Sequence, residues 1–84
     1  MELLKKYGLD GRDPHFYFSF LDRLRSDCEY YLGCGGRYSR HLWTRDEYEH
    51  IALMRAIYNL LPVKPAWLTL EQIEDYADRM LLWY

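Results

Sequence analysis

Four side chains in the middle of this 84-residue chain are of types that ligate soft metal ions. Successive members are six, seven and nine residues apart: Cys28, Cys34, His41 and His50. Structural zinc sites usually draw their ligands from tight pairs such as Cys-x2–4-Cys, which fix a local loop before the two halves meet. No pair here has that spacing, and Cys28 falls among apolar positions, where a free cysteine behaves as a small hydrophobic residue. We therefore expect no metal site and no cofactor.

The two cysteines could also form a disulfide or supply a reactive thiol. A Cys28–Cys34 disulfide is within reach across a helix end, although a reducing compartment would disfavour it. Cys34, close to Arg37 in a glycine-rich turn, is alternatively a reactive thiol, but no base is predicted beside it. The three serines lie outside any nucleophile motif, and no glycine-rich loop has phosphate-binding spacing. We expect no catalytic residue and predict that the chain is not an enzyme.

The connection at residues 33–45 combines basic and aromatic side chains without any acidic residue. Arginines contact phosphates and aromatic rings stack on bases, so such a segment is typical of nucleic-acid contact. A helix-turn-helix is not indicated, because this connection is about ten residues long and the helix after it is mixed in charge. The residues that would make the contact are Arg37, Arg40 and Arg45, interleaved with Tyr38, His41 and Trp43.

Aromatic residues in and around this connection are also candidates for binding a protein. Exposed aromatic rings together with arginine are the composition of interface hot spots. Exposed apolar area of this kind is compatible with a monomer or with a weak homodimer. The candidate partner-binding residues are Tyr30, Arg37, Tyr38, Arg40, His41 and Trp83.

The first of three predicted helices spans about residues 13–32. Asp13 is its expected N-cap, and a proline follows at the first helical position, where its missing N–H has no intrahelical partner to lose. Gly33 stands where a glycine commonly ends a helix. Apolar residues at spacings of three and four define the buried face: Tyr17, Leu21, Leu24, Cys28 and Tyr31.

The second predicted helix spans about residues 44–61. Thr44 and Glu47 have the spacing of a capping box, in which each side chain accepts a hydrogen bond from the other residue's backbone N–H. Trp43 and Tyr48 occupy the two positions of a hydrophobic staple across the same cap. The apolar stripe of this helix is wide enough to contact two neighbouring helices.

The third predicted helix spans about 69–83, and Thr69 and Gln72 form a second capping box. Short connections between three helices predict an antiparallel bundle. The fold class is therefore all-α: a small three-helix antiparallel bundle, with residues 1–12 as a short N-terminal extension and 13–84 as a single helical domain.

Charge and hydropathy limit the kinds of partner and the cellular location that we expect for the protein. The net charge of −2 gives no global attraction to nucleic acid or to an anionic membrane. No apolar run has the length of a membrane span, and the first residues lack the apolar stretch of a signal peptide. With only two cysteines, a reducing cytoplasm is the expected location and no membrane contact is expected.

Several segments resemble one family of small helical modules. LDRLRSDCEYYLG, HLW and IALMRAIYNLLPVKPAWLTLEQIEDYADRM are similar in order and spacing to the large polyvalent protein-associated domains of the eleventh class. The resemblance implies an origin in the giant multidomain proteins of conjugative elements and phages, mainly in Gram-positive bacteria. It assigns no catalytic residue.

These observations together predict a non-enzymatic accessory or adaptor module of a bacterial mobile element, which binds an unidentified protein partner in the cytoplasm. The alternative is a module that contacts nucleic acid through the basic connection at 33–45.

Overall fold

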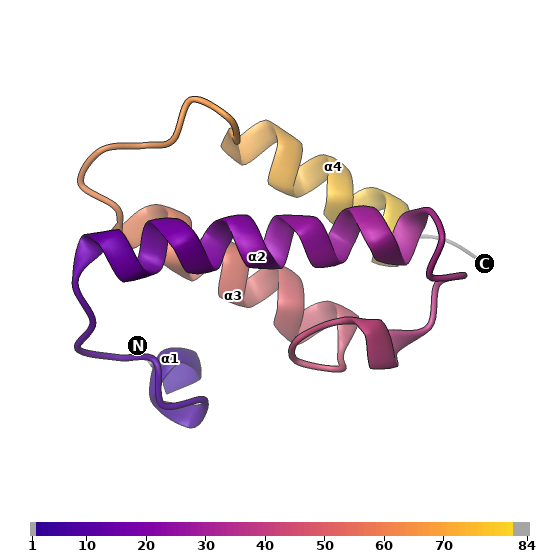
Figure 1. Cartoon of the computed structure of the whole chain (residues 1–84), viewed down its shortest axis with the longest axis horizontal. Helices are drawn as coiled ribbons and strands as arrows, with labels where there is room; N and C mark the ends of the chain where they lie inside the picture. The colour runs from indigo at the N-terminus through magenta and orange to yellow at the C-terminus, as the bar shows by residue number, and fades with distance from the viewer. Residues whose placement is uncertain (1, 82–84) are drawn as a thin grey trace.

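The described part of the chain folds into helices joined by turns and loops. This computed structural model describes residues 2–81, where helices and the turns between them leave no strand, so the predicted all-α fold is confirmed. No helix in this range is both long enough and apolar enough to cross a membrane. The elements are α1 (Glu2–Lys6), α2 (Pro14–Leu32), the 3-10 helix η1 (Ser39–His41), α3 (Glu47–Leu60) and α4 (Leu70–Leu81) (Figure 1).

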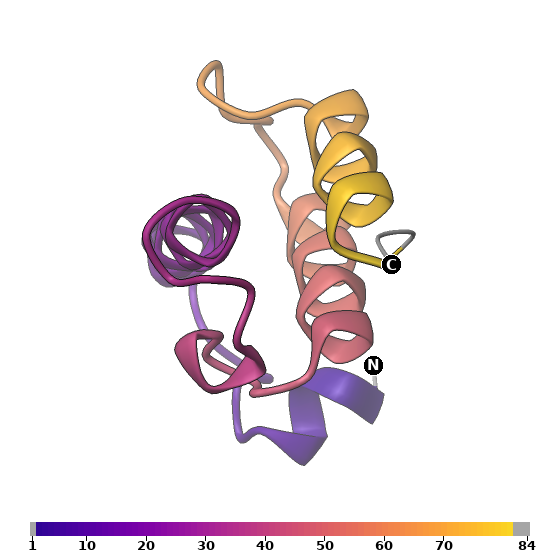
Figure 2. The ribbon, with the colours of Figure 1, turned by 90° about the vertical axis from the view of Figure 1, so that its right-hand side faces the viewer.

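Helices α2, α3 and α4 form a bundle in which successive helices run in opposite directions. Figure 1 shows α3 running back behind α2 at an angle and α4 returning above them. In Figure 2, α3 lies between α4 on one side and α1 on the other, while α2 passes beside it. Helix α3 thus contacts α1, α2 and α4, and it is the central helix of the predicted bundle.

The hydrophobic core forms around α3. Its segment IALMRAI places apolar side chains on more than one side of the helix, so that one neighbour cannot cover them all. Fully burying one large apolar side chain contributes roughly 1.5–3 kcal/mol to stability. The fully buried apolar residues of α3 are Ile51, Leu53, Met54 and Ile57, and they pack with Leu21, Leu24 and Cys28 of α2 and with Ile73, Ala77 and Met80 of α4.

Helix α2 has its predicted caps. The Oδ1 atom of Asp13 accepts a hydrogen bond from the amide of Phe16, at an N–O distance of 2.8 Å. At the other end, the N–H of Gly33 donates to two carbonyls of the last helical turn. Gly33 has a φ of −105°, however, and the left-handed conformation that favours glycine comes three residues later, at Gly36, where φ is 67°.

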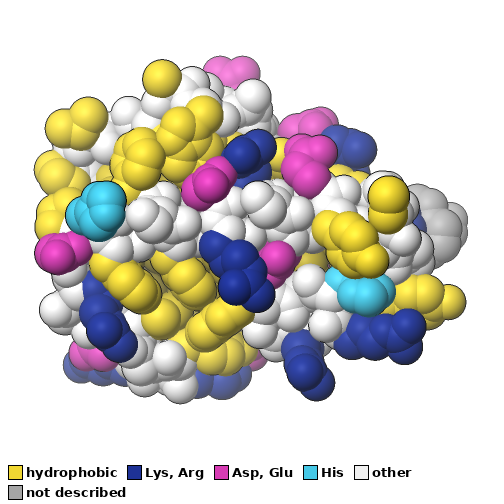
Figure 3. Space-filling model, viewed as in Figure 1, with side chains coloured by type: hydrophobic (Ala, Val, Ile, Leu, Met, Phe, Trp, Pro, Cys, Tyr) yellow, Lys and Arg dark blue, Asp and Glu magenta, His cyan; other side chains and the backbone are white. Residues whose placement is uncertain are grey.

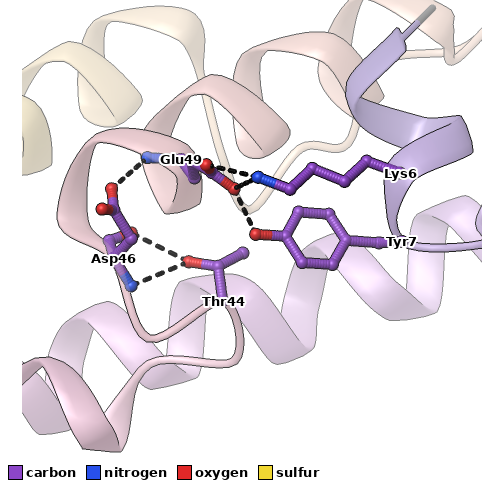
Figure 4. Close-up of polar contacts among 5 residues, drawn as sticks. All are labelled: Lys6, Tyr7, Thr44, Asp46 and Glu49. Carbon is purple, nitrogen blue, oxygen red and sulfur yellow. Dashed lines mark hydrogen bonds and ion pairs between the residues drawn. The ribbon is translucent and has the colours of Figure 1, made fainter.

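Helix α3 begins at Glu47, later than predicted, and Thr44 is not its N-cap. Asp46 caps the helix, because its Oδ1 accepts a hydrogen bond from the Glu49 amide at 2.9 Å (Figure 4). The Thr44 hydroxyl hydrogen-bonds the backbone of Asp46 instead and stabilises the turn before the helix. Glu47 does not close a capping box, since its two carboxylate oxygens accept hydrogen bonds from other elements.

The capping box of α4 is present. The Thr69 amide donates to Oε1 of Gln72 at 2.9 Å, and the Gln72 amide donates to the Thr69 hydroxyl at 3.2 Å. Each side chain therefore satisfies a backbone N–H that has no partner inside the helix. The described part of α4 ends at Leu81, so its predicted end at residue 83 lies outside the described residues.

The N-terminal extension contains a helix of its own, which packs against α3. Leu4 and Leu9 are buried in the core. Nζ of Lys6 lies 2.7 Å from Oε2 of Glu49, and the Tyr7 hydroxyl donates a hydrogen bond to the same carboxylate (Figure 4). Helix α1 was not predicted from the sequence, because five residues are too few to display a helical period.

The side chain of Trp43 packs against Tyr7, directly after α1, and against α2. Its ring stands edge-to-face with the ring of Tyr7, with centroids 5.2 Å apart, and with that of Phe20, at 5.0 Å. Tyr48, the predicted staple partner of Trp43, is 68% exposed. The staple is wrong because it depended on an N-cap at Thr44.

The turn after α2 requires glycine at position 35. The Gly35 amide donates to the Tyr30 carbonyl at an N–O distance of 2.6 Å. A Cβ atom at this position would lie 2.7 Å from that carbonyl oxygen and 3.0 Å from the tyrosine ring. Gly36 and Arg37 then adopt φ values of 67° and 64° and turn the chain toward η1.

Substituting Gly35→Ala is expected to lower the free energy of unfolding by about 2 kcal/mol or more, because the new Cβ can be accommodated only by moving backbone. Gly8→Ala is the matched control: φ is 69° there, but nothing lies within 4 Å of an added Cβ. The control should lose only the conformational cost of about 1 kcal/mol. Urea unfolding of the two variants checks this; equal losses would contradict the close approach at Gly35.

Candidate functional site

Four of the predicted partner-binding residues come together at one end of the bundle. The ring of His41 stands edge-on to two tyrosine rings, with its centroid 5.0 Å from that of Tyr30 and 6.3 Å from that of Tyr38. The guanidinium carbon of Arg40 lies over the Tyr38 ring, 4.8 Å from its centroid. Tyr30 is 49% exposed and Tyr38 is 57% exposed. We call these four residues the aromatic–basic cluster.

Secondary structure holds this cluster in place. Tyr30 lies in the last turn of α2, and the other members lie at the start of η1 or within it. The His41 amide donates to the Tyr38 carbonyl at 3.0 Å, and Leu42, directly after η1, is buried in the core. Figure 3 shows basic and histidine side chains beside hydrophobic ones at this end of the molecule, on the right. The side chains of the cluster therefore project from ordered backbone, in the last turn of α2 and at η1.

A hydrogen-bond network next to the cluster joins η1 to α2 and α3. One oxygen of the Glu47 carboxylate accepts from the Tyr31 hydroxyl at 2.7 Å, and the other accepts from the Ser39 hydroxyl at 2.8 Å. Burial by itself would raise the pKa of Glu47, but the two hydrogen bonds outweigh it and lower this pKa below its usual value. Burial and the bond to Glu47 raise the pKa of Tyr31 to about 12. Glu47 thus anchors η1.

The other predicted contact residues have different surroundings. Arg37 is half-buried: its amide donates to the Tyr31 carbonyl at 3.0 Å, and its guanidinium charge acts on the Tyr31 hydroxyl. Arg45 is exposed, with a φ of 60°. Trp43 is half-buried between α1 and α2. Trp83 lies outside residues 2–81, which the structure describes.

The two cysteines are free thiols in different surroundings. Cys28 is buried, with its Sγ 3.5 Å from Sδ of Met54, and burial raises the pKa of its thiol to about 12. This thiol is a packing element, since a reactive cysteine needs an accessible thiolate. Cys34 is exposed in the glycine-rich turn. Within residues 2–81, no three His, Cys, Asp or Glu side chains are arranged to hold a metal ion.

His50, considered above as a zinc ligand, is a core residue. Its side chain is fully buried, and Nε2 lies 2.9 Å from the Leu24 carbonyl oxygen of α2. A neutral ring that donates from Nε2 fits this contact, and Nδ1 then finds no hydrogen-bond partner in the described part of the chain. Burial lowers the pKa of His50, and the hydrogen bond to Leu24 only partly opposes that shift.

A second surface, not predicted from the sequence, lies at the other end of α2. It is an open groove between the start of α2 and the connection from α3 to α4. The ring of Trp67 stands edge-on to that of Phe18, 5.2 Å away, and Val63 is 76% exposed. The sequence feature that could have indicated this groove is the apolar, proline-containing connection PVKPAW. The groove is lined by Pro14, His15, Phe18, Leu61, Pro62 and Val63.

Removing one hydroxyl from the Glu47 network should destabilise the fold. We expect Tyr31→Phe to lower the free energy of unfolding by about 1–2 kcal/mol, because the half-buried carboxylate loses one of its two side-chain donors. Tyr48→Phe is the control, since that side chain is 68% exposed, and its effect should stay within about 0.5 kcal/mol. Chemical denaturation measures both; equal effects would show that the Tyr31 hydroxyl contributes nothing.

The buried His50 should make stability depend on pH. The unfolded chain binds a proton on this residue near its ordinary pKa of about 6.5, whereas the folded chain binds it only at lower pH. The contribution of neutral His50 to the free energy of unfolding is therefore fully present above about pH 6.5. It is lost as the pH falls below that value, by at most about 1.4 kcal/mol per pH unit.

Unfolding measured between pH 7 and 5.5 should show this loss in the natural chain and a smaller one in His50→Leu, which has a side chain of similar volume without a titrating group. The window lies above the range in which the carboxylates protonate. His15 and His41 remain in both proteins, so the difference between the two curves belongs to His50. Parallel curves would contradict the prediction.

Comparison with known proteins places the domain. A family model, that of large polyvalent protein-associated domain 11, matches residues 14–80, about four fifths of the chain. The match begins at the first residue of α2, so α1 lies outside it. Searches of curated proteins and of solved structures found no match. The chain thus belongs to the family of large polyvalent protein-associated domain 11.

Proposed function

We propose that this domain is a non-enzymatic adaptor that binds a protein partner through the aromatic–basic cluster. The observation that carries the proposal is the exposure of two tyrosine rings, Tyr30 and Tyr38, next to an arginine on a folded support. Tyrosine and arginine are enriched among residues that dominate binding energy. Such rings bury a large area on binding while few side-chain torsions have to be fixed.

Contacts within the cluster support the same function. The Tyr30 and Tyr38 rings are held by edge-on contact with His41, and Arg40 is held over Tyr38. Side chains that are already ordered lose less entropy when a partner binds. The cluster is therefore suited to recognition of another surface.

The family suggests the setting in which the adaptor acts. The family is named for an association with large polyvalent proteins. We propose that this domain serves a bacterial mobile element, such as a conjugative element or phage. The proposed location is the bacterial cytoplasm. The proposed state is a monomer or weak homodimer until the partner binds.

Nucleic-acid contact is the second candidate, and the absence of acidic residues from 33–45 favours it. Two features of the geometry count against it. Trp43, the largest ring of the connection, is half-buried against Tyr7 and Phe20, and one face of Tyr38 is covered by Arg40. Base stacking needs an open ring face.

Affinity capture of the tagged chain tests the adaptor function. The bait is incubated with lysate of a Gram-positive bacterium that carries a conjugative element, and half of the lysate is treated with nuclease. We expect one protein to be retained after nuclease treatment, and retention to fall about fivefold or more for Tyr38→Ala, the loss that removal of a binding hot spot produces.

Tyr48→Ala is the matched control, because Tyr48 is a tyrosine even more exposed than Tyr38 but lies on α3 outside the cluster. It should retain the partner in full, and both variants should melt within a few degrees of the natural chain. Capture that disappears with nuclease would favour the nucleic-acid function instead. Retention that is insensitive to Tyr38→Ala would exclude this surface.

A further inference from the structure

We propose that the aromatic–basic cluster binds an acidic segment of the partner, in which carboxylate side chains flank an apolar one. This inference rests on the adaptor function and adds the chemistry of the partner. Its main element is Arg40, whose guanidinium carbon lies 4.8 Å from the centroid of the Tyr38 ring. Its apolar element is the exposed ring of Tyr30 on the neighbouring turn of α2.

The stacked position of Arg40 suits it to a carboxylate. A guanidinium that lies over an aromatic ring uses its flat face for the ring and keeps its N–H groups around the edge. Those edge donors match the two oxygens of a carboxylate in a bidentate pair. Because Tyr38 holds the side chain in place, less entropy is lost when the pair forms.

Within the part of the chain that the structure describes, Arg40 forms no ion pair with a carboxylate. The connection at 33–45 has no acidic residue, and the two carboxylates that follow it at once make their hydrogen bonds with groups other than Arg40. Asp46 accepts from the Glu49 amide as the helix cap, and Glu47 accepts from Tyr31 and Ser39. The guanidinium of Arg40 therefore presents a positive charge with which no carboxylate of the described residues pairs, and the complementary group on the partner is an acidic one.

The positions of the rings favour a peptide over a nucleic acid as the source of that negative charge. A single strand would bring its bases onto open aromatic faces, but Arg40 covers one face of Tyr38, and Trp43 packs against Tyr7 and Phe20. The exposed part of Tyr30 is an apolar contact next to the charge. A carboxylate beside an apolar side chain satisfies both features.

NMR titration of the full chain with a short peptide tests the inference. The probe is acetyl-Glu-Glu-Leu-Glu-Glu-amide, and its twin has glutamine at every glutamate. We expect amide shifts confined to Tyr30 and residues 38–41 with the acidic probe, and much weaker shifts with the twin. Arg40→Gln should weaken binding about tenfold, which is the loss of one charge-assisted bidentate pair.

Arg79→Gln is the matched control, because Arg79 is an exposed arginine on α4 that lies 3.6 Å from Asp75. It should bind the acidic probe as the natural chain does. Any of three ligand titrations could overturn the inference: equal binding of the glutamine twin, equal binding by Arg40→Gln, or tighter binding of a short oligothymidylate at the same residues. Shifts at 38–41 caused by raising the protein concentration alone would assign the carboxylates to a second copy and overturn it too.

Failure of this inference can be told apart from failure of the adaptor function. If the acidic probe does not bind but nuclease-resistant capture still depends on Tyr38, the adaptor function stands and the acidic chemistry is wrong. If no protein survives nuclease treatment, the adaptor function is itself wrong.

Discussion

Burial of α3 is the constraint on which the rest of this structure depends. Apolar side chains emerge from α3 in several directions, and α1, α2 and α4 each contact it. A chain of 84 residues has only one core to build, so each neighbour of α3 contributes a large share of a total stability of a few kcal/mol. His50 also contributes to this core, since its neutral ring fills core volume and hydrogen-bonds α2.

Tyrosine hydroxyls fasten the other elements around that core. Tyr7 reaches Glu49 between α1 and α3, Tyr31 reaches Glu47 between α2 and α3, and Tyr76 reaches Glu29 between α4 and α2. Tyr17 donates to the Leu9 carbonyl at 2.7 Å and holds the chain that follows α1. A tyrosine buries most of its ring and still reaches a polar partner at the edge of the core, which suits a bundle too small to bury many residues completely.

Neighbouring tyrosines in the last turn of α2 have different roles, one in the core and one at the surface. Tyr31 lies in the core with its hydroxyl on Glu47, whereas its neighbour Tyr30 points its ring toward η1 and solvent. Because helix geometry places adjacent residues on different faces, one turn of α2 both anchors η1 and supplies a member of the aromatic–basic cluster. The stability of the 33–45 connection and the position of the Tyr30 ring therefore depend on the same helical turn. Gly35 allows the connection to approach the Tyr30 carbonyl and ring closely.

The sequence by itself determined the all-α class, the three helices of the bundle and the caps at Asp13 and Thr69, because periodicity and capping chemistry are local. It also indicated Tyr30, Tyr38, Arg40 and His41 as surface candidates. Only the tertiary structure decided that these four meet, that Asp46 rather than Thr44 caps α3, and that residues 2–9 cover α3. Each of these depends on a partner distant in sequence: Glu47 bonds Tyr31, Lys6 pairs with Glu49, and a five-residue helix is stable only against a surface that local pattern does not reveal.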